Sequence, residues 1–172
     1  MSESNSANQD PAMRETMGAL VGRIPSGLYI VTVADGQGRE TGMLASWVQQ
    51  AAFEPLAVTV AIHQKRYLNE WIAATGRIAL SIVGQSQTDL LKHFGKGFEP
   101  DEPAFEGLAT STTPAGLTVL ADSLGFIEGR VSGRLDAGDH RVYVVQLTAG
   151  GQGSRFGDES PYVHLRKSGL GY

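Results

Sequence analysis

The stretch TGMLASWVQQ, from Thr41 to Gln50, lies between two hydrophobic runs at residues 27–34 and 56–62 and is therefore expected to lie within a β-sheet. Its small side chains are unusual for a buried strand. They are Gly42, Ala45 and Ser46. Small side chains let a flat ligand approach the peptide groups, but they also suit a bent strand with a glycine-rich start. The stretch alone leaves both interpretations open.

Length and composition indicate a globular domain rich in turns. The chain has 172 residues, 41% of them hydrophobic and 19% charged, which is enough to bury one sizeable core. Twenty-two glycines and seven prolines favour a β-rich architecture over a helical bundle. With a net charge of −4 and a pI near 5.5, no general attraction to nucleic acid or to a membrane surface is expected. An anionic ligand would need a local cluster of bases.

Several classes of protein are disfavoured by missing features. The chain has no cysteine, so it has neither disulfides nor thiolate chemistry, and this suits the reducing cytoplasm that we predict as its location. No run approaches the roughly 18 apolar residues of a membrane-spanning helix. Residues 1–12 are predicted to be a flexible tail without signal-peptide features, and residues 13–172 to form the domain.

Two short segments carry helix signals. Asp10 and Pro11 have the pattern of an N-cap followed by the first helical residue. Apolar residues then follow at helical spacing and are expected to pack in the core: Met13, Met17, Leu20 and Val21. Further along, Ser86 and Asp89 have the spacing of a capping box that would open a second helix.

The remaining periodicity predicts a mainly β protein, an antiparallel barrel of at least six strands with two or three short helices. The strands are expected at 28–34, 41–50, 56–62, 77–83, 124–135 and 141–148, with a short closing strand at 162–165 and a helix at 67–74. The long segment 99–116 shows no periodicity, and a loop of that length is usually functional or covered by a partner.

Lys65 and Arg66 stand where a strand ends and a helix begins. The free N–H groups of a helix start favour anions, and adjacent cations strengthen such a site, so a phosphate is a plausible guest. The alternative is a solvated basic corner. A second basic segment, with Lys92, follows at the predicted exit of the next helix.

The motifs of common catalytic sites are absent from the sequence. Its four histidines lie far apart and without metal-binding spacing, so no metal is expected. There is no Gly-x-Ser-x-Gly elbow, and no Gly-x-Gly-x-x-Gly pattern precedes a helix. No side chain is therefore assigned a catalytic role, and any reaction is expected to belong to a bound cofactor.

The order of several segments resembles the flavin reductase-like, FMN-binding split-barrel family. These segments are PSGLYIVTVADG, GMLASWVQQAAFEPLAVTVAI, KR at a helix start, RIALSIV, and GDH before RVYVVQL. LLKHFGKGF, AFEGL and the terminal HLRKSG with a final Tyr are most similar to the flavin reductase domains of cyanobacterial diflavin flavoproteins and their stand-alone relatives. The resemblance spans residues 24–172.

The resemblance implies a six-stranded Greek-key split barrel that forms a homodimer and binds FMN, with FAD as the alternative, near the subunit interface. NADH or NADPH would deliver a hydride to the flavin, and the electrons would pass to free flavin, a partner protein or oxygen. The implied flavin contacts are Met43, Leu44, Ala45, Ser46, Trp47, Val48 and Gln49. The implied phosphate contacts are Lys65 and Arg66, with Lys92 and His140 as weaker transfers.

Two departures from the family pattern bear on these assignments. Lys65-Arg66-Tyr67 replaces the common Ser-x-Thr, and Trp47 is bulkier than the usual Ser or Phe. Trp47 therefore has three candidate roles: stacking on flavin, shielding it, or packing in the dimer interface. His140 has two, as a ligand contact or as a cap of its hairpin.

Three functions follow as hypotheses. The first is an NAD(P)H:flavin oxidoreductase. The second is a flavoredoxin-like electron carrier that holds FMN tightly without efficient direct NAD(P)H oxidation. The third is a split-barrel dimer that has lost its cofactor.

Overall fold

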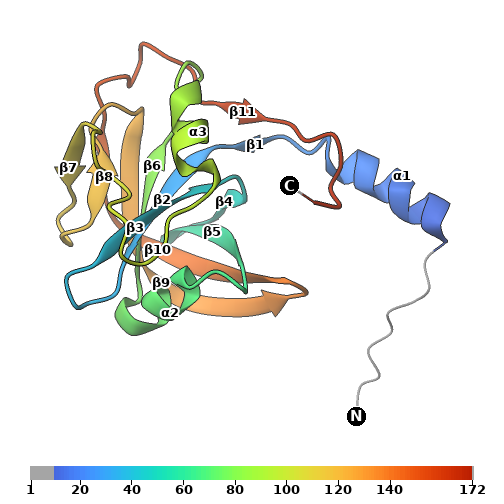
Figure 1. Ribbon diagram of the computed structural model, residues 1–172, viewed down its shortest axis with the longest axis horizontal. Helices are drawn as coiled ribbons and strands as arrows, with labels where there is room; N and C mark the ends of the chain where they lie inside the picture. The colour runs from blue at the N-terminus through green and yellow to red at the C-terminus, as the bar shows by residue number, and fades with distance from the viewer. Residues whose placement is uncertain (1–9, 172) are drawn as a thin grey trace. The chain divides into compact units, whose positions relative to one another are not determined.

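The computed structural model describes residues 10–171 (Figure 1). Of these, residues 10–26 together with 163–171 form one compact unit, and Gly27–Tyr162 forms the other. Most of the predicted tail lies outside the described residues. Its last two positions, Pro11 and Ala12, already belong to a helix.

The smaller unit contains helix α1 (Pro11–Val21) and β11 (Val163–His164), which pairs with β1 (Ser26–Gly27) at the boundary of the two units. The predicted N-cap is confirmed, because Asp10 Oδ1 accepts a hydrogen bond from the Ala12 N–H at 3.2 Å. The predicted closing strand is shorter than expected.

The expected burial of the apolar face of α1 is wrong. Met13, Met17, Leu20 and Val21 are 56%, 36%, 66% and 43% exposed. The C-terminal segment instead crosses the helix at its glycines. The Gly169 N–H donates to Gly18 O at 2.6 Å, and a Cβ at Gly18 would lie 2.5 Å from Leu170 Cγ. Only the side of the helix that carries glycines allows so close an approach. The C-terminal segment therefore covers that side.

The larger unit is built on a seven-stranded antiparallel sheet in the order β3-β2-β6-β9-β10-β5-β4 (Figure 1). Its strands are β2 (Tyr29–Ala34), β3 (Glu40–Ala45), β4 (Val48–Phe53), β5 (Leu56–His63), β6 (Arg77–Ile82), β9 (Gly125–Ala137) and β10 (His140–Gln152). The mainly β prediction is confirmed, with one strand more than the six expected. The extra strand arises because the stretch 41–50 is divided between β3 and β4.

Two helices and a small hairpin complete this unit. Helix α2 (Leu68–Thr75) ends at Gly76, whose φ of 64° is the left-handed conformation that glycine adopts readily. Helix α3 (Thr88–Gly95) follows β6, and β7 (Thr110–Thr112) pairs with β8 (Thr118–Leu120). The predicted irregular segment 99–116 therefore consists of turns and one short strand.

The predicted capping box at the start of α3 is wrong. The cap residue is Gln87, which makes no side-chain capping bond, and its Oε1 accepts from the Gly84 N–H at 2.9 Å instead. Ser86 Oγ accepts from Arg155 Nη1 at 3.0 Å. Arg155, which is distant in sequence, thus forms a hydrogen bond with the hydroxyl that local spacing assigned to the helix cap.

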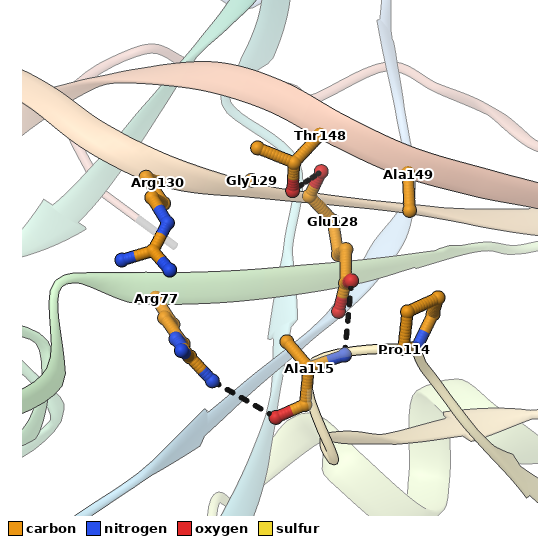
Figure 2. A pocket seen from close by; sticks show the side chains of 8 residues that line it. All are labelled: Arg77, Pro114, Ala115, Glu128, Gly129, Arg130, Thr148 and Ala149. Carbon is orange, nitrogen blue, oxygen red and sulfur yellow. Dashed lines mark hydrogen bonds between the residues drawn. The ribbon is translucent and has the colours of Figure 1, made fainter.

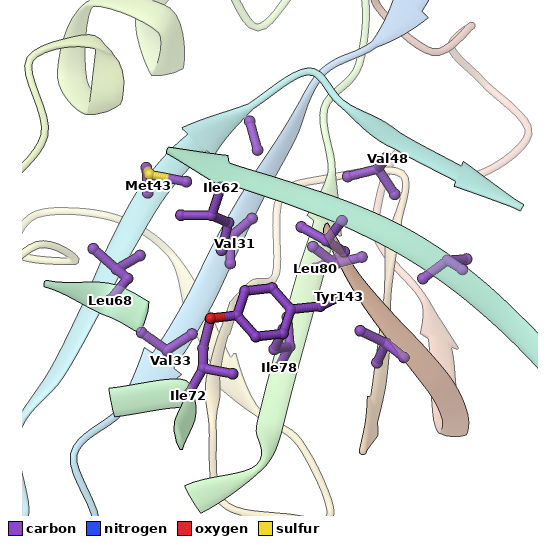
Figure 3. Packing of buried hydrophobic residues seen from close by; sticks show 14 of the residues in the cluster. Val31, Val33, Met43, Val48, Ile62, Leu68, Ile72, Ile78, Leu80 and Tyr143 are labelled. Atoms are coloured by element: carbon purple, nitrogen blue, oxygen red, sulfur yellow. The ribbon is translucent and has the colours of Figure 1, made fainter. Parts of the chain in front are cut away.

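The core divides into two main clusters on opposite faces of β2. Val31 and Val33 belong to the first, which includes buried residues of β5 and β6 and Tyr143 (Figure 3). Leu28 and Ile30 belong to the second, with Leu90 and Phe94 of α3. β2 is therefore buried on both faces, and Val58, Val60 and Ile62 form the buried face of β5.

Candidate functional site

The break in the stretch 41–50 falls at Ser46 and Trp47. The two residues join β3, which pairs with β2, to β4, which pairs with β5. Between these strands the Trp47 carbonyl accepts a hydrogen bond from the Ala61 N–H at 3.0 Å. The bent-strand interpretation is therefore confirmed, and the bend leaves Ser46 and Trp47 partly exposed.

The side chains of this stretch point in different directions. Met43, Ala45 and Val48 are buried in the first core cluster, whereas Leu44 packs against the second. Gln49 is exposed. A ligand at this stretch would therefore meet the partly exposed side chains and the peptide groups, while the three buried side chains hold the strand in place.

Gly42 serves internal packing. A Cβ at this position would lie 2.6 Å from Phe94 Cε1 and 2.9 Å from Phe105 Cζ, which is closer than real Cβ contacts. The missing side chain lets two aromatic rings lie against β3. The explanation of small residues as space for a flat ligand therefore does not apply to Gly42.

Trp47 lies beside two histidines from paired strands. The ring centroids of Trp47 and His140 are 4.5 Å apart, and those of His140 and His63 are 5.1 Å apart. His140 stands opposite His63 in the pairing of β10 with β5. The chain thus brings together residues 47, 63 and 140, which are distant in sequence.

Asp139 fixes the orientation of His140. Its Oδ1 lies 2.7 Å from His140 Nδ1, and its Oδ2 lies 3.9 Å from His63 Nε2. The hydrogen bond with His140 holds the pKa of the Asp139 carboxyl below its usual value. His140 is 6% exposed, bonded to Asp139 of its own hairpin and packed on Trp47. These contacts fit the role of a hairpin cap, and the role of a ligand contact stays a prediction.

Hydrogen bonds from the side chain of Asn69 hold the turn that carries Lys65 and Arg66. Asn69 Nδ2 donates to His63 O at 2.9 Å and to Arg66 O at 2.8 Å, and Tyr143 Oη donates to Asn69 Oδ1 at 2.8 Å. The side chains of Lys65 and Arg66 are exposed, and neither forms an ion pair with a carboxylate of residues 10–171. The turn therefore presents two cations that remain available to an anion.

Asn69 supports this turn, and the sequence pattern did not reveal that role. It occupies a buried position of α2 between Leu68 and Trp71, where periodicity predicts an apolar residue. The only signal in the sequence for this role is a polar residue on the apolar face of the helix.

The loop after α3 lies beside this turn. Tyr67 Oη donates to Phe98 O at 2.9 Å, and a Cβ at Gly97 would lie 2.9 Å from Arg66 Nη1. Lys92 is on α3 and pairs with Asp89 at 3.7 Å. The contacts described above group Trp47, His140, Lys65 and Arg66 around His63. The ion pair of Lys92 with Asp89 lies within α3, and a contact of Lys92 with a ligand stays a prediction.

Within residues 10–171, no three His, Asp or Glu side chains are grouped so that they could hold a metal ion. None of the helices there is long and apolar enough to cross a membrane.

The antiparallel sheet with the break at Ser46–Trp47 is the split barrel of flavin reductases. An NADH:FAD oxidoreductase of Streptomyces globisporus, SgcE6, matches it with a TM-score of 0.80 at 18% identity, covering 91% of each chain. The same enzyme in complex with NAD and FAD fragments matches with a TM-score of 0.77 at 17% identity, covering 91% of this chain and 90% of the other.

The sequence comparison defines the family. The model of the flavin reductase like domain matches residues 21–169, so the chain belongs to this family and is an oxidoreductase domain of that type. Diflavin flavoprotein A 1 of Synechocystis sp. is 37% identical over 153 residues. That match covers 88% of this chain but only 26% of the relative, so the chain spans about a quarter of that protein.

Proposed function

We propose that the protein is an FMN-binding NAD(P)H:flavin oxidoreductase that passes electrons on to free flavin, a partner protein or oxygen. The observation that carries this proposal is the grouping of Trp47, His140 and the Lys65–Arg66 turn in a member of the flavin reductase-like family. The S. globisporus enzyme, described as binding fragments of NAD and FAD, supports a flavin and a nicotinamide as ligands.

The chemistry of these residues fits a flavin mononucleotide. Trp47 offers a partly exposed aromatic surface at a strand break, beside the partly exposed Ser46. A carboxylate of the chain would compete with an anionic ligand for Lys65 and Arg66. No carboxylate of the described chain forms an ion pair with either residue. These cations suit the FMN phosphate, with Lys92 proposed as a more distant contributor.

The side chains of this site orient the bound flavin and take no part in bond making or breaking. A bound flavin supplies the hydride chemistry, and the protein contributes orientation and electrostatics. Asn69 and Tyr143 hold the basic turn, and Asp139 holds the ring of His140 against Trp47. No side chain needs to donate or accept a proton, since hydride transfer requires only the stacking of nicotinamide over flavin.

The deciding experiment is a rate measurement. The purified protein with FMN should oxidise NADH or NADPH faster than free FMN does under the same conditions. Anaerobic titrations with each nicotinamide then show which one is preferred, and replacing FMN with FAD tests the cofactor. A rate equal to that of free flavin with every combination would refute the oxidoreductase.

An electron carrier is the second candidate. The chain matches a quarter of a diflavin flavoprotein, and this favours electron exchange with another protein module. A retained yellow cofactor in the purified protein, combined with slow oxidation of NADH and NADPH, would favour the carrier. Absence of any FMN binding in a fluorescence titration would instead favour a barrel that has lost its cofactor.

A further inference from the structure

A separate pocket of about 310 Å³ lies along β6, β9 and β10 (Figure 2). Its wall includes Thr148 of β10, eight residues from His140 on the same strand. At about 3.4 Å per residue, these two positions are roughly 25 Å apart. The pocket is therefore distinct from the proposed flavin site, and nothing in the proposed function uses it.

Two arginines form one part of the wall. Arg77 of β6 and Arg130 of β9 are direct cross-strand partners. Arg77 Nη1 donates to Ala115 O at 3.1 Å, and neither guanidinium pairs with a carboxylate among residues 10–171. Like charges on opposed residues disfavour each other unless an anion lies between them. Guanidinium groups recognise carboxylate and phosphate by paired hydrogen bonds, so this pair is suited to an oxyanion.

Glu128 provides the opposite charge in the same pocket. It is only 3% exposed, and its Oε1 accepts from the Ala115 N–H at 3.2 Å. Its Oε2 is buried and has no hydrogen-bond partner among the described residues. A buried carboxylate oxygen without a donor is costly, and native proteins rarely leave one unpaired. Figure 2 shows this carboxylate and Arg77 directed toward the segment that contains Ala115.

We propose that this pocket binds a small zwitterion, with its oxyanion between Arg77 and Arg130 and its ammonium group on Glu128 Oε2. The ligand would supply the anion that the arginines lack and the donor that Glu128 lacks. The volume of about 310 Å³ is at the lower end of the range for small-molecule sites and limits the ligand to a compact molecule. The oxyanion is a carboxylate or a phosphate, which both fit the guanidinium pair.

Calorimetric titrations of the full chain at low salt test this proposal. β-Alanine and O-phosphoethanolamine carry an ammonium group two carbons from a carboxylate or a phosphate. Ethanolamine and inorganic phosphate supply each charge alone. One of the two zwitterions should bind at one site at least tenfold more tightly than either single-charge probe. The tighter zwitterion identifies the oxyanion.

Three variants locate the binding. Glu128→Gln and Arg130→Ala should each weaken zwitterion binding at least tenfold, and only Arg130→Ala should weaken phosphate. Arg134→Ala, an exposed arginine on the same strand, is the matched control and should change neither. NAD(P)H oxidation should be unchanged in all three, which separates this proposal from the flavin site.

The outcomes that overturn the proposal are equally definite. One is the absence of saturable binding of all four probes by the folded wild-type chain. Another is zwitterion binding no tighter than that of phosphate. Binding that Glu128→Gln leaves unchanged, with the circular dichroism spectrum intact, would also exclude Glu128 as the ammonium contact.

Discussion

At the scale of single residues, Trp47 is the most informative side chain of the candidate site. It lies at the strand break and packs on His140, whereas the other tryptophan, Trp71, is 7% exposed and belongs to the core. If flavin binds beside Trp47, FMN should quench mainly the fluorescence of this residue. The Trp47→Phe variant should therefore lose most of the FMN-induced quenching, while Trp71→Phe retains it. Equal quenching in both variants would place the flavin elsewhere.

Arg66 allows the phosphate contact to be measured directly. The Arg66→Ala variant should bind FMN about 10- to 100-fold more weakly, because a charge-assisted contact contributes about 1.5–3 kcal/mol. Riboflavin lacks the phosphate, so its affinity should not change. Arg134→Ala is the control, since it removes an exposed arginine from β9. Equal weakening of FMN and riboflavin would argue against a phosphate role for Arg66.

At the scale of elements, the packing of α3 on β3 depends on Gly42. A methyl group there would collide with the rings of Phe94 and Phe105. Gly42→Ala should therefore lower the free energy of unfolding by about 1–3 kcal/mol in urea denaturation. Gly95→Ala is the matched control, because a Cβ at Gly95 would meet nothing within 4 Å. A stability of Gly42→Ala equal to that of the control would show that the helix shifts at little cost.

The turn between β2 and β3 depends on the charge of Asp35. Its Oδ2 accepts from Arg39 Nε at 2.7 Å, and its Oδ1 accepts from the N–H groups of Gln37 and Arg39. The hydrogen bond from the Arg39 side chain, followed by these backbone bonds, lowers the pKa of Asp35 below 3.8. The folded state therefore prefers ionised Asp35, and the resulting stability is present above pH 3.8 and lost as the pH falls through the lowered pKa.

The Asp35→Asn variant tests this linkage. It should have a lower thermal midpoint than the wild type at pH 7, because the amide keeps an acceptor for the backbone but loses the ion pair with Arg39. The difference should shrink as the pH falls below about 3.8. A difference that does not shrink at all below pH 3.8 would show that the charge is not its cause.

At the scale of the whole molecule, assembly is the main expectation. The barrel leaves large apolar side chains exposed, with Phe53 at 87% and Leu135 at 68%. Exposed apolar surface of this kind is consistent with a partner, and the resemblance to split-barrel flavin reductases implies a second copy of the chain. Light scattering coupled to size exclusion should give about twice the chain mass of 18.3 kDa. A mass of one chain at micromolar concentration would exclude a stable homodimer.

The sequence by itself determined most of the strand pattern and the family. Continuous apolar runs and alternation specify β2 and β5, because the apolar or polar character of the residues on each face of a strand indicates whether that face is buried. Segment order identified the flavin reductase-like family. The signals that failed were local ones: the capping box at Ser86, where the hydroxyl accepts from Arg155, and the apolar face of α1, which is exposed.

Only the tertiary structure decided which residues meet. It divided the stretch 41–50 into two strands, assigned Gly42 to packing against α3, and placed Trp47 against His140. It also placed Glu128, whose Oε2 has no hydrogen-bond partner among residues 10–171, in one pocket with Arg77 and Arg130. The spacing of apolar residues along a chain indicates whether a segment is a helix or a strand and which of its faces is buried. Contacts between residues almost a hundred positions apart depend on how the sheet closes, which no single segment encodes.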